Sequence, residues 1–348
     1  MTSTQDISDL IMPSPPSKNI PRACLFNLVA YAPNAKRLPR ILEIVHAIGS
    51  KFPCRLVLIT HAQEAAGVRV ETLPNPCVKQ KNGYDQVFIY ADSEKLNKVP
   101  FLVMPYLIPD LPINLLWDED PTSDDPVLNY LKGFATRIIF DASGIEDWSA
   151  FAHRMGVLIG QNSYDYMDIS WALISSWRDT VARLFNDAQA LDELRRCQKV
   201  RILCRHSTDY ATGIYLLSWL SAQLDWKLVQ SKQCEGVIET TFAFDKANIA
   251  TAIAEQPSTV KSEHGIASVE IVTSSGTVYQ MTHRPACRTV ITHVIHDSCC
   301  DLPITLPFAC LNQSFAFMKE LLHHRSSSHY RNMLSKLTEF KNVKKNHS

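Results

Sequence analysis

The sequence predicts an α/β protein with two α/β domains of similar layout, each with a mixed sheet flanked by helices. Three observations support this fold class. Short apolar runs typical of buried strands recur along the chain. Each half begins with such a run, followed by an amphipathic helix and a second run, which is the pattern of a β-α-β unit. The length of 348 residues suits about two domains at the usual ~100–200 residues each.

In the first half, residues 24–31 and 55–60 predict two buried strands. Apolar residues between them recur at helical spacing, namely Leu38, Ile41, Leu42, Val45 and Ile48. Residues 68–73 and 86–90 predict two more strands around an Asn82-Gly83 turn. The proline-rich segment 99–117 is interpreted as buried core, with a short helix within 99–109. Further strands are predicted at 113–117 and 137–141.

In the second half, residues 168–185 predict one amphipathic helix, and we place the domain boundary just before it, near residue 165. A strand at 200–204, a helix at 210–224 and a strand at 227–230 repeat the β-α-β pattern. The remaining predictions are a strand at 237–244, a helix at 245–255, a hairpin of 267–273 with 277–282, and a strand at 289–296.

The chain therefore divides into four predicted segments. They are a disordered leader at 1–21, an N-terminal domain at 22–165, a C-terminal domain at 166–318 and a tail at 319–348. The tail carries seven Lys and Arg residues against two Glu residues. Such a basic, weakly apolar segment is typical of a solvated helix or a frayed end, and a weak contact with an acidic partner is the alternative.

Composition excludes several classes of protein. The 35 Lys and Arg residues balance 35 Asp and Glu residues, whereas a dedicated nucleic-acid binder normally carries a basic excess. The N-terminus lacks the pattern of a secretory signal, and four prolines with Asp110 interrupt the longest apolar stretch, so we expect no membrane span. Ten cysteines without a C-x-x-C motif are expected to be reduced thiols in the cytoplasm.

No motif for catalysis or for cofactor binding stands out. The first β-α turn, residues 32–36, and its second-half equivalent, 205–209, both lack the glycine-rich pattern that a dinucleotide needs. No P-loop or nucleophile elbow occurs, and Ser143 after a predicted strand has no evident activating histidine. We therefore expect no cofactor and no catalytic residues.

Two clusters leave alternatives open. The acidic run at 118–120 and 124–125 could hold Mg²⁺, although a solvated loop that leads into a helix cap is favoured. The region 283–310 is rich in His and Cys, but its irregular spacing disfavours zinc, and we expect no metal. A thiol switch that pairs Cys299 or Cys300 with Cys310 is the sharper hypothesis, against idle or buried cysteines.

Three stretches together resemble one family. The first runs from Pro21-Arg22-Ala23-Cys24 through Asn27-Leu28-Val29 to Pro53-Cys54-Arg55-Leu56-Val57. The second runs from Ile108-Pro109-Asp110-Leu111-Pro112 to Leu116-Trp117, with Asp124-Asp125-Pro126 and Arg137-Ile138-Ile139-Phe140-Asp141-Ala142-Ser143. The third comprises Asp168-Ile169-Ser170-Trp171-Ala172, Ser176-Trp177-Arg178 and Leu184-Phe185. Their order and spacing resemble the glucose-6-phosphate dehydrogenase assembly protein family, OpcA, over about residues 22–300.

This resemblance implies a non-catalytic assembly factor or allosteric activator. It would bind glucose-6-phosphate dehydrogenase of the oxidative pentose phosphate pathway and favour the active oligomer of that enzyme. Candidate partner contacts are Asp110, Trp117, Trp177 and Arg178, because Trp and Arg dominate interface hot spots. Core packing is the alternative for both tryptophans.

An enzyme of the same pathway, such as a 6-phosphogluconolactonase or another sugar-phosphate enzyme, is the competing hypothesis. It would need a histidine or carboxylate that is poised for proton transfer. The loop histidines available for that role are His61, His206 and His264.

Overall fold

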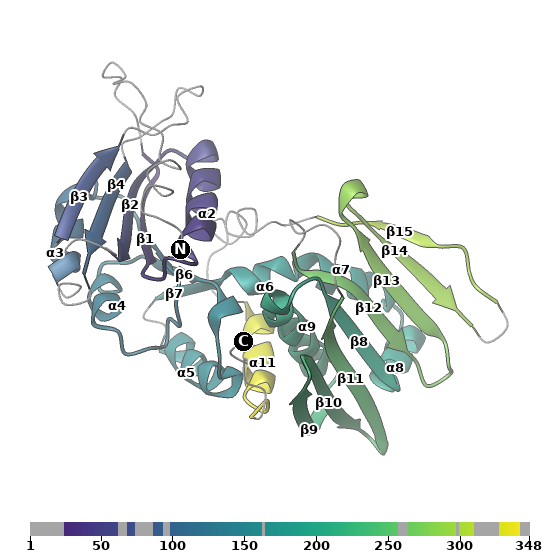
Figure 1. Cartoon of the computed structure of the whole chain (residues 1–348). Helices are drawn as coiled ribbons and strands as arrows, with labels where there is room; N and C mark the ends of the chain where they lie inside the picture. Colours follow the sequence, from purple (N-terminus) through teal and green to yellow (C-terminus); the bar gives the residue numbers. More distant parts are fainter. Residues whose placement is uncertain are drawn as a thin grey trace. The chain divides into compact units, whose positions relative to one another are not determined.

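The computed structural model describes most of the chain, and Figure 1 labels its elements. The described residues are 24–61, 68–73, 86–92, 98–161, 164–256, 264–296, 299–309 and 327–341. They form two compact units that a single cut in the sequence does not separate. Unit 1 runs to Asp141 and takes in Asn162–Asp168, whereas unit 2 includes Ala142–Gln161, Ile169–Ala316 and the last helix. The predicted leader lies outside the described residues.

Unit 1 is built on a seven-stranded sheet in the order β3-β4-β2-β1-β5-β6-β7. Its strands are β1 (Phe26–Ala32), β2 (Cys54–His61), β3 (Val68–Leu73), β4 (Gln86–Ala91), β5 (Ile113–Trp117), β6 (Arg137–Phe140) and β7 (Asp165–Asp168). Every pairing is parallel except that of β3 with β4. The first predicted β-α-β unit is confirmed. Helix α2 (Leu38–Lys51) connects β1 to β2, and these two strands pair in parallel.

The helices of unit 1 follow their apolar patterns. All five positions predicted for the buried stripe of α2 are buried. The short helix predicted within 99–109 is present as α3 (Val99–Val103) and the 3-10 turn η2 (Met104–Tyr106). Helix α4 (Pro126–Leu131) begins at Asp125, whose carboxylate accepts a hydrogen bond of 2.9 Å from the Leu128 N–H. The interpretation of 99–117 as buried core is wrong in part, because Phe101 is 63% exposed and Pro105, Pro109, Asp110 and Pro112 are also exposed.

Unit 2 is built on an eight-stranded sheet in the order β15-β14-β13-β12-β8-β11-β10-β9. Its strands are β8 (Lys199–Cys204), β9 (Lys227–Cys234), β10 (Val237–Phe244), β11 (Ala247–Glu255), β12 (Ile266–Val272), β13 (Val278–Arg284), β14 (Thr289–Ile295) and β15 (Ile304–Pro307). Only the pairing of β8 with β11 is parallel. The hairpin predicted at 267–282 is confirmed as β12 and β13.

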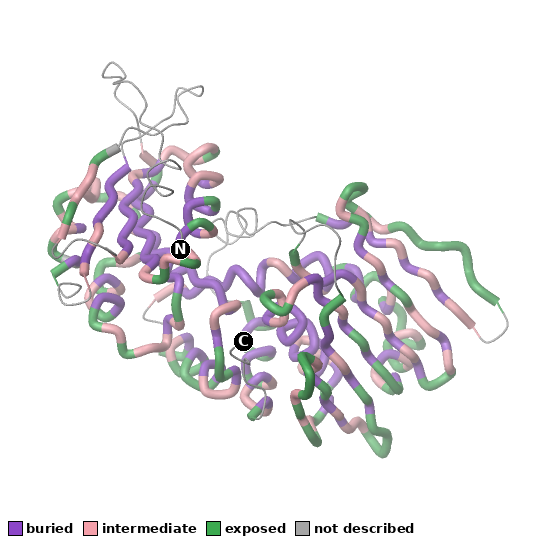
Figure 2. The backbone as a smooth tube through the Cα atoms, viewed as in Figure 1, coloured by how far each residue is buried: buried purple, intermediate pink, exposed green. Residues whose placement is uncertain are grey.

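Helices and short turns complete unit 2. They are η3 (Ala142–Gly144), α5 (Trp148–Gly160), α6 (Ile169–Leu173), α7 (Ser175–Leu184), α8 (Ala188–Arg195), η4 (Ser207–Asp209), α9 (Tyr210–Gln223), η5 (Pro285–Cys287) and α11 (Ser328–Leu337). Helix α9 packs closely on β8 and β11, because a Cβ atom at Gly213 would lie 2.9 Å from Cγ2 of Ile253. Strand β8 alternates exposed and buried residues, as expected for a sheet covered on one face (Figure 2).

The predicted helix at 245–255 is wrong, since strand β11 (Ala247–Glu255) occupies nearly all of this range. Their alanines suit a helix, but Ile249, Thr251 and Ile253 alternate with more exposed residues and are all buried. Asp245 adopts a left-handed conformation, with φ 55°, in the two-residue turn that leads from β10 into β11. The alternation of buried and exposed residues, together with the tight turn before β11, outweighs the helix propensity of the alanines and produces a strand.

The second predicted β-α-β unit is also wrong in its pairing. Strand β9 lies at the edge of the sheet and pairs only with β10. The turn between them consists of Glu235 and Gly236, which both have positive φ values, of 48° and 76°. Two such residues form the tight hairpin turn that joins antiparallel strands. The parallel partner of β8 is therefore β11, which follows the hairpin.

The helix predicted at 168–185 is divided. Asp168 ends β7, and α6 and α7 are separated by Ile174, whose backbone (φ −85°, ψ 1°) departs from helical geometry. A broad apolar face is common to both short helices, so the sequence pattern did not reveal the break.

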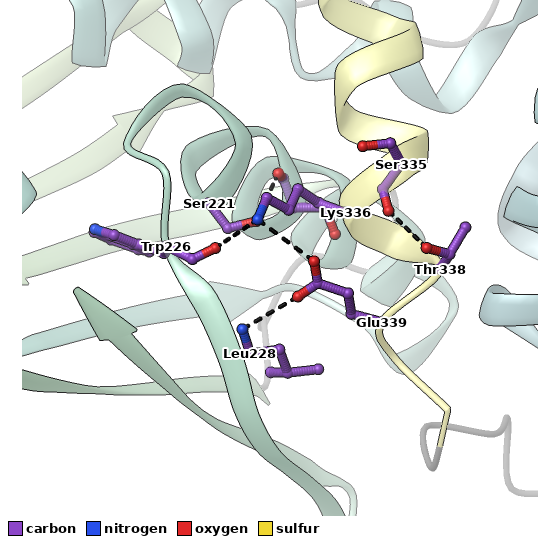
Figure 3. Close-up of polar contacts among 8 residues, drawn as sticks. Ser221, Trp226, Leu228, Ser335, Lys336, Thr338 and Glu339 are labelled. Carbon is purple, nitrogen blue, oxygen red and sulfur yellow. Dashed lines mark hydrogen bonds and ion pairs between the residues drawn. The ribbon is translucent and has the colours of Figure 1, made fainter. Parts of the chain in front are cut away.

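The C-terminal tail contributes to the core of unit 2. Helix α11 packs against α9 and α5 and buries Tyr330, Met333, Leu334 and Leu337. Lys336 Nζ donates a hydrogen bond of 2.8 Å to the Trp226 carbonyl, and Glu339 accepts one of 3.1 Å from the Leu228 N–H (Figure 3). The tail, predicted at 319–348 as a solvated helix or a frayed end, contains a helix at 328–337, and one face of that helix is buried.

The predicted fold class is confirmed, with two α/β domains and a mixed sheet flanked by helices in each. No helix within the described part of the chain is long and apolar enough to span a bilayer.

Candidate functional site

The carboxyl ends of β1 and β5 form the central part of one edge of the sheet in unit 1. Successive strands run outward from β1 to β2 and β4 on one side, and from β5 to β6 and β7 on the other. In open parallel sheets, ligands bind beyond the carboxyl ends of the strands, at the point where the strand order reverses. The residues at this edge therefore decide whether unit 1 can hold a nucleotide.

Two ion pairs occupy this edge. Arg37, just before α2, lies 2.7 Å from a carboxylate oxygen of Asp118, which follows β5. Arg40, in the first turn of α2, forms an ion pair with Asp141, which follows β6. Both carboxylates are buried, whereas the two guanidinium groups remain partly exposed. The pairs link α2 to the ends of two strands.

Burial shifts the protonation of the acidic side chains at this edge. Burial raises the pKa of Asp118 to about 7; Arg37 counteracts this and Asp141 adds to it. Burial, together with the charge of Asp125, also raises the pKa of Glu119.

Asn34 engages three backbone N–H groups at the N-terminus of α2. Asn34 accepts hydrogen bonds from the Lys36 N–H through its side chain (2.9 Å) and from the Arg37 and Leu38 N–H groups through its carbonyl (3.0 and 3.1 Å). The next residue, Pro39, has no N–H. A dinucleotide site needs a glycine-rich turn here, and residues 32–36 contain no glycine.

Of the predicted partner contacts, the structure places Trp117 in the core. Its ring stacks on Tyr31 of the neighbouring strand, with ring centroids 4.1 Å apart and planes 8° from parallel, and it has no exposed surface. Core packing, the alternative interpretation, describes this side chain.

Asp110 is at the surface. It lies in the turn before β5 and adopts a left-handed conformation, with φ 64°, that Asp tolerates better than most residues. The buried side chain of Asn27 fixes the same loop, because it donates to the Ile108 carbonyl (3.0 Å) and accepts from the Ile108 N–H (2.9 Å). Asp110 is thus presented on a fixed turn.

The other two predicted contacts lie in unit 2. Trp177 is buried edge-on against Phe308 and His283, with ring centroids 5.1 and 6.5 Å away. Arg178 is partly exposed, and its guanidinium carbon lies 3.6 Å from the ring centroid of Trp171. Trp177 is therefore a core residue, while Arg178 retains some accessible surface. Asp110 and Trp117 belong to unit 1, whereas Trp177 and Arg178 belong to unit 2.

The cysteine cluster is resolved only in part. Cys299 and Cys300 are exposed, and the third candidate, Cys310, lies outside the described residues. His296 near them contacts Asp301 at 3.3 Å, and its other ring nitrogen lies 3.2 Å from the Thr277 hydroxyl. The thiol switch remains a prediction. Over the described ranges, no group of three His, Cys, Asp or Glu side chains is arranged to hold a metal ion.

The acidic run after β5 has structural roles. Asp120 accepts hydrogen bonds from the N–H and the hydroxyl of Thr122, at 2.8 and 2.6 Å. Asp125 caps α4, as the preferred alternative predicted. These bonds form a loop that leads into a helix cap.

The loop histidines are divided between the units. His206 and His264 lie together in unit 2, with ring centroids 5.0 Å apart, and His264 approaches Asp209 at 3.5 Å. His61 ends β2 in unit 1. A histidine pair beside a carboxylate can bind and release protons.

Three aromatic residues of unit 1 were not predicted as candidates. Phe101 lies on α3, Tyr130 lies on α4, and Phe134 follows α4. Their rings touch in a row at the surface of unit 1. Helical spacing gave no signal for them, because Tyr130 and Phe134 each lie three residues after a member of the buried stripe of α4, Val127 and Leu131.

Two models of known protein families match this chain. The model of the glucose-6-phosphate dehydrogenase subunit N-terminal domain, from the OpcA assembly family, matches residues 45–156. The model of the corresponding C-terminal domain matches residues 164–318. Together they cover most of the chain in the expected order.

The chain belongs to the OpcA family. The resemblance predicted from the three sequence stretches is thereby confirmed. Helix α11 lies beyond the part matched by the C-terminal OpcA model, although it completes the core of unit 2. No curated protein sequence matches the chain.

Solved structures share the fold of this OpcA-family chain. Two variants of KijD10, a 3-ketoreductase from Actinomadura kijaniata in complex with TDP-benzene and NADP, superpose with TM-scores of 0.53 and 0.52. Each match covers 90% of this chain and 95% of the reductase, at 10% and 9% sequence identity. The likeness at this identity shows a common fold and nothing about activity.

Proposed function

We propose that this chain is a non-catalytic partner of glucose-6-phosphate dehydrogenase that binds the enzyme and favours its active oligomer. The match of both halves to the OpcA assembly family is the observation that carries the proposal. The proposal takes the enzyme as the only partner needed, with no cofactor held by this chain.

The edge of unit 1 supports a non-catalytic role. In an oxidoreductase of this fold, backbone N–H groups at the first β-α turn bind the pyrophosphate of the dinucleotide. Here Asn34 occupies those N–H groups, Pro39 lacks one, and buried Asp118 stands nearby. A pyrophosphate would have to displace the bonds to Asn34, which supports the proposal.

An activator without chemistry acts through differential affinity. It must bind the active state of the enzyme more tightly than the inactive state, and it shifts the equilibrium by that difference alone. A tenfold preference corresponds to about 1.4 kcal/mol at 25 °C. The chain would therefore raise activity most where the enzyme alone populates its active oligomer poorly.

Size-exclusion chromatography with light scattering, combined with an activity assay, tests the proposal. The cognate dehydrogenase is measured alone and with increasing amounts of the chain, at enzyme concentrations where the oligomer dissociates. We expect co-elution, a shift to a larger enzyme species and a higher rate per enzyme molecule. The heat-unfolded chain is the control. Absence of co-elution together with an unchanged rate would refute the proposal.

A second assay addresses the alternative activity. The chain alone is incubated with glucose 6-phosphate and a nicotinamide cofactor, and separately with 6-phosphogluconolactone. No turnover is expected in either case. Turnover that a His206→Ala variant abolishes would favour an enzyme of the same pathway instead.

A further inference from the structure

Two histidines and an aspartate meet near the N-terminus of α9 in unit 2. The ring centroids of His206 and His264 are 5.0 Å apart, and Nδ1 of His264 lies 3.5 Å from Oδ1 of Asp209. His206 precedes η4, Asp209 ends it, and His264 lies two residues before β12. We name these three residues the histidine cluster. The cluster connects two segments that are far apart in the sequence.

The cluster lies at a junction of the backbone. Strands β8 and β11 pair in parallel, so their carboxyl ends lie side by side. The Gln256 N–H donates a hydrogen bond of 2.7 Å to the Cys204 carbonyl, and the Arg205 N–H donates one of 3.0 Å to the Gly265 carbonyl. The residue that leaves β11 and the residue that enters β12 are therefore both bonded to the end of β8. His264 adds a side-chain contact to this junction.

The cluster has unused capacity for a proton. Oδ2 of Asp209 and Nε2 of His206 are buried, and neither atom has a hydrogen-bond partner in the part of the chain that the structure describes. Burial raises the pKa of Asp209, whereas the Gly265 N–H and the two imidazoles counteract this shift. Buried polar atoms without partners cost free energy. A proton on an imidazole would therefore be stabilised here, and it would turn the contact of His264 with Asp209 into an ion pair.

The groups around the cluster favour one proton and disfavour two. Burial raises the pKa of Cys204 on β8 and of Tyr210 on α9, and the Glu255 carboxylate of β11 adds to both shifts, so these two groups are uncharged near pH 7. Arg205 directs its guanidinium to the His283 carbonyl, at 3.5 Å. The nearby carboxylates thus favour a first positive charge, whereas two imidazolium rings with centroids 5.0 Å apart would repel each other.

We infer that the histidine cluster is a proton-dependent clasp between the entry to β12 and the N-terminus of α9. When one imidazole is charged, His264 and Asp209 form an ion pair and the clasp is closed. When both imidazoles are neutral, only a weaker polar contact remains and the clasp loosens. Histidine side chains in general change charge between about pH 5 and 8, so we expect the clasp to tighten as the pH falls through this range. The device belongs to the chain itself and needs no partner.

Amide hydrogen exchange of the full chain tests the clasp. The reporter is the Gly265 amide, which bonds the Asp209 carboxylate. Its protection factor, corrected for the intrinsic effect of pH on exchange, is measured at pH 5.5, 6.5 and 8.0. The amide of Val269, within β12, is the internal reference, because it reports on opening of the whole sheet. The variant is His264→Gln, and the matched control is His153→Gln, at an exposed position of α5 in the same unit.

We expect the protection of Gly265 relative to Val269 to rise about two- to fivefold from pH 8.0 to pH 5.5 in wild type, the range for an exposed ion pair. The His264→Gln variant should show no such rise, and the His153→Gln variant should follow wild type. Because the His264 side chain is 62% exposed, 500 mM NaCl should also reduce the rise in wild type.

Three results would overturn the clasp. They are a ratio in wild type that does not change with pH, an equal rise in the His264→Gln variant, and a rise that high salt leaves intact. Thermal melting of each variant shows whether it is folded. If His264→Gln melts early, the pH and salt series of the wild-type chain still decides the matter, since it needs no substitution.

Discussion

The guanidinium of Arg178 lies over the ring of Trp171, 3.6 Å from its centroid. The two residues come from the two halves of one sequence block, D-x-x-W-A and W-R, which fold into consecutive helices α6 and α7. A cation over an aromatic face contributes about 0.5–2 kcal/mol, depending on exposure. The contact explains why the two motifs occur together, because it holds α6 against α7 across their break.

Replacement of Arg178 by Met is therefore expected to destabilise unit 2. The variant keeps much of the length of the side chain but loses its charge, so we expect the free energy of unfolding to fall by about 1 kcal/mol in urea. Arg183→Met, at an exposed position of the same helix, should stay within ~0.5 kcal/mol of wild type. A double-mutant cycle with Trp171→Leu isolates the pair, and a coupling energy near zero would contradict the prediction.

Asp118 should make stability fall as pH rises from about 4 to 7. Its pKa is raised from 3.8 to about 7, so the folded chain holds a proton in this range that the unfolded chain has released. The effect reaches about 4 kcal/mol at most. Asp118→Asn removes this slope, which urea midpoints at pH 5, 6 and 7.5 can measure. An identical pH profile for variant and wild type would rule out this role.

His283 should produce the opposite slope. Burial, with a smaller contribution from Arg205, lowers its pKa from 6.5 to about 4, so the unfolded chain binds a proton that the folded chain does not. This stability contribution is complete above pH 6.5 and is lost as pH falls toward 4, by about 3 kcal/mol at most. His283→Gln should resist acid better than wild type. Because the two residues act in opposite directions, each variant is measured against wild type over the same pH series.

Two glycines should respond to alanine in opposite ways. At Gly213 a Cβ atom would lie 2.9 Å from Ile253 and 3.1 Å from Cys204, so Gly213→Ala should destabilise unit 2 by about 1–3 kcal/mol. At Gly156, on the exposed side of α5, a Cβ meets nothing within 4 Å. Gly156→Ala should therefore stabilise the chain by about 0.5–1 kcal/mol through helix propensity. Equal effects at both positions in thermal unfolding would contradict the close packing of α9.

Helix α11 should be needed for the stability of unit 2. Glu339→Ala would leave the Leu228 N–H without its acceptor and is expected to cost about 1–2 kcal/mol. Thr338→Ala nearby removes only an exposed hydroxyl contact within the tail and serves as the control. Hydrogen exchange at β9 would show faster exchange of the Leu228 amide in the Glu339 variant alone. Unchanged exchange there would argue against the contact.

Local patterns were enough to predict part of this structure. The apolar runs of β1 and β2 and the helical spacing of α2 are set within a few residues, so the first β-α-β unit was predictable. The pairing of β8 with β11 was not, since it depends on the hairpin of β9 and β10 that intervenes. The alanines of β11 favour a helix in isolation, and the neighbouring strands decide otherwise.

In the candidate site, too, some features were predictable from the local sequence and others depended on the fold. The missing glycine-rich turn at 32–36 was visible in the sequence, and the use of Asn34 as an acceptor agrees with it. The burial of Trp117 and Trp177 could not be predicted, because composition does not tell a hot-spot tryptophan from a core tryptophan. The exposure of Phe101 was missed for the converse reason: an apolar run suggests burial until the fold shows which side of α3 faces solvent.

The docking of α11 has a consequence for synthesis on the ribosome. The side chains that cover α9 and α5 come from residues 328–340, so the surface beneath them stays uncovered until this stretch has emerged from the exit tunnel. A nascent chain paused before that point presents Tyr215 and Trp171 without their partner Tyr330. Such intermediates are substrates for chaperones, and the fold of unit 2 matures only after translation of this helix.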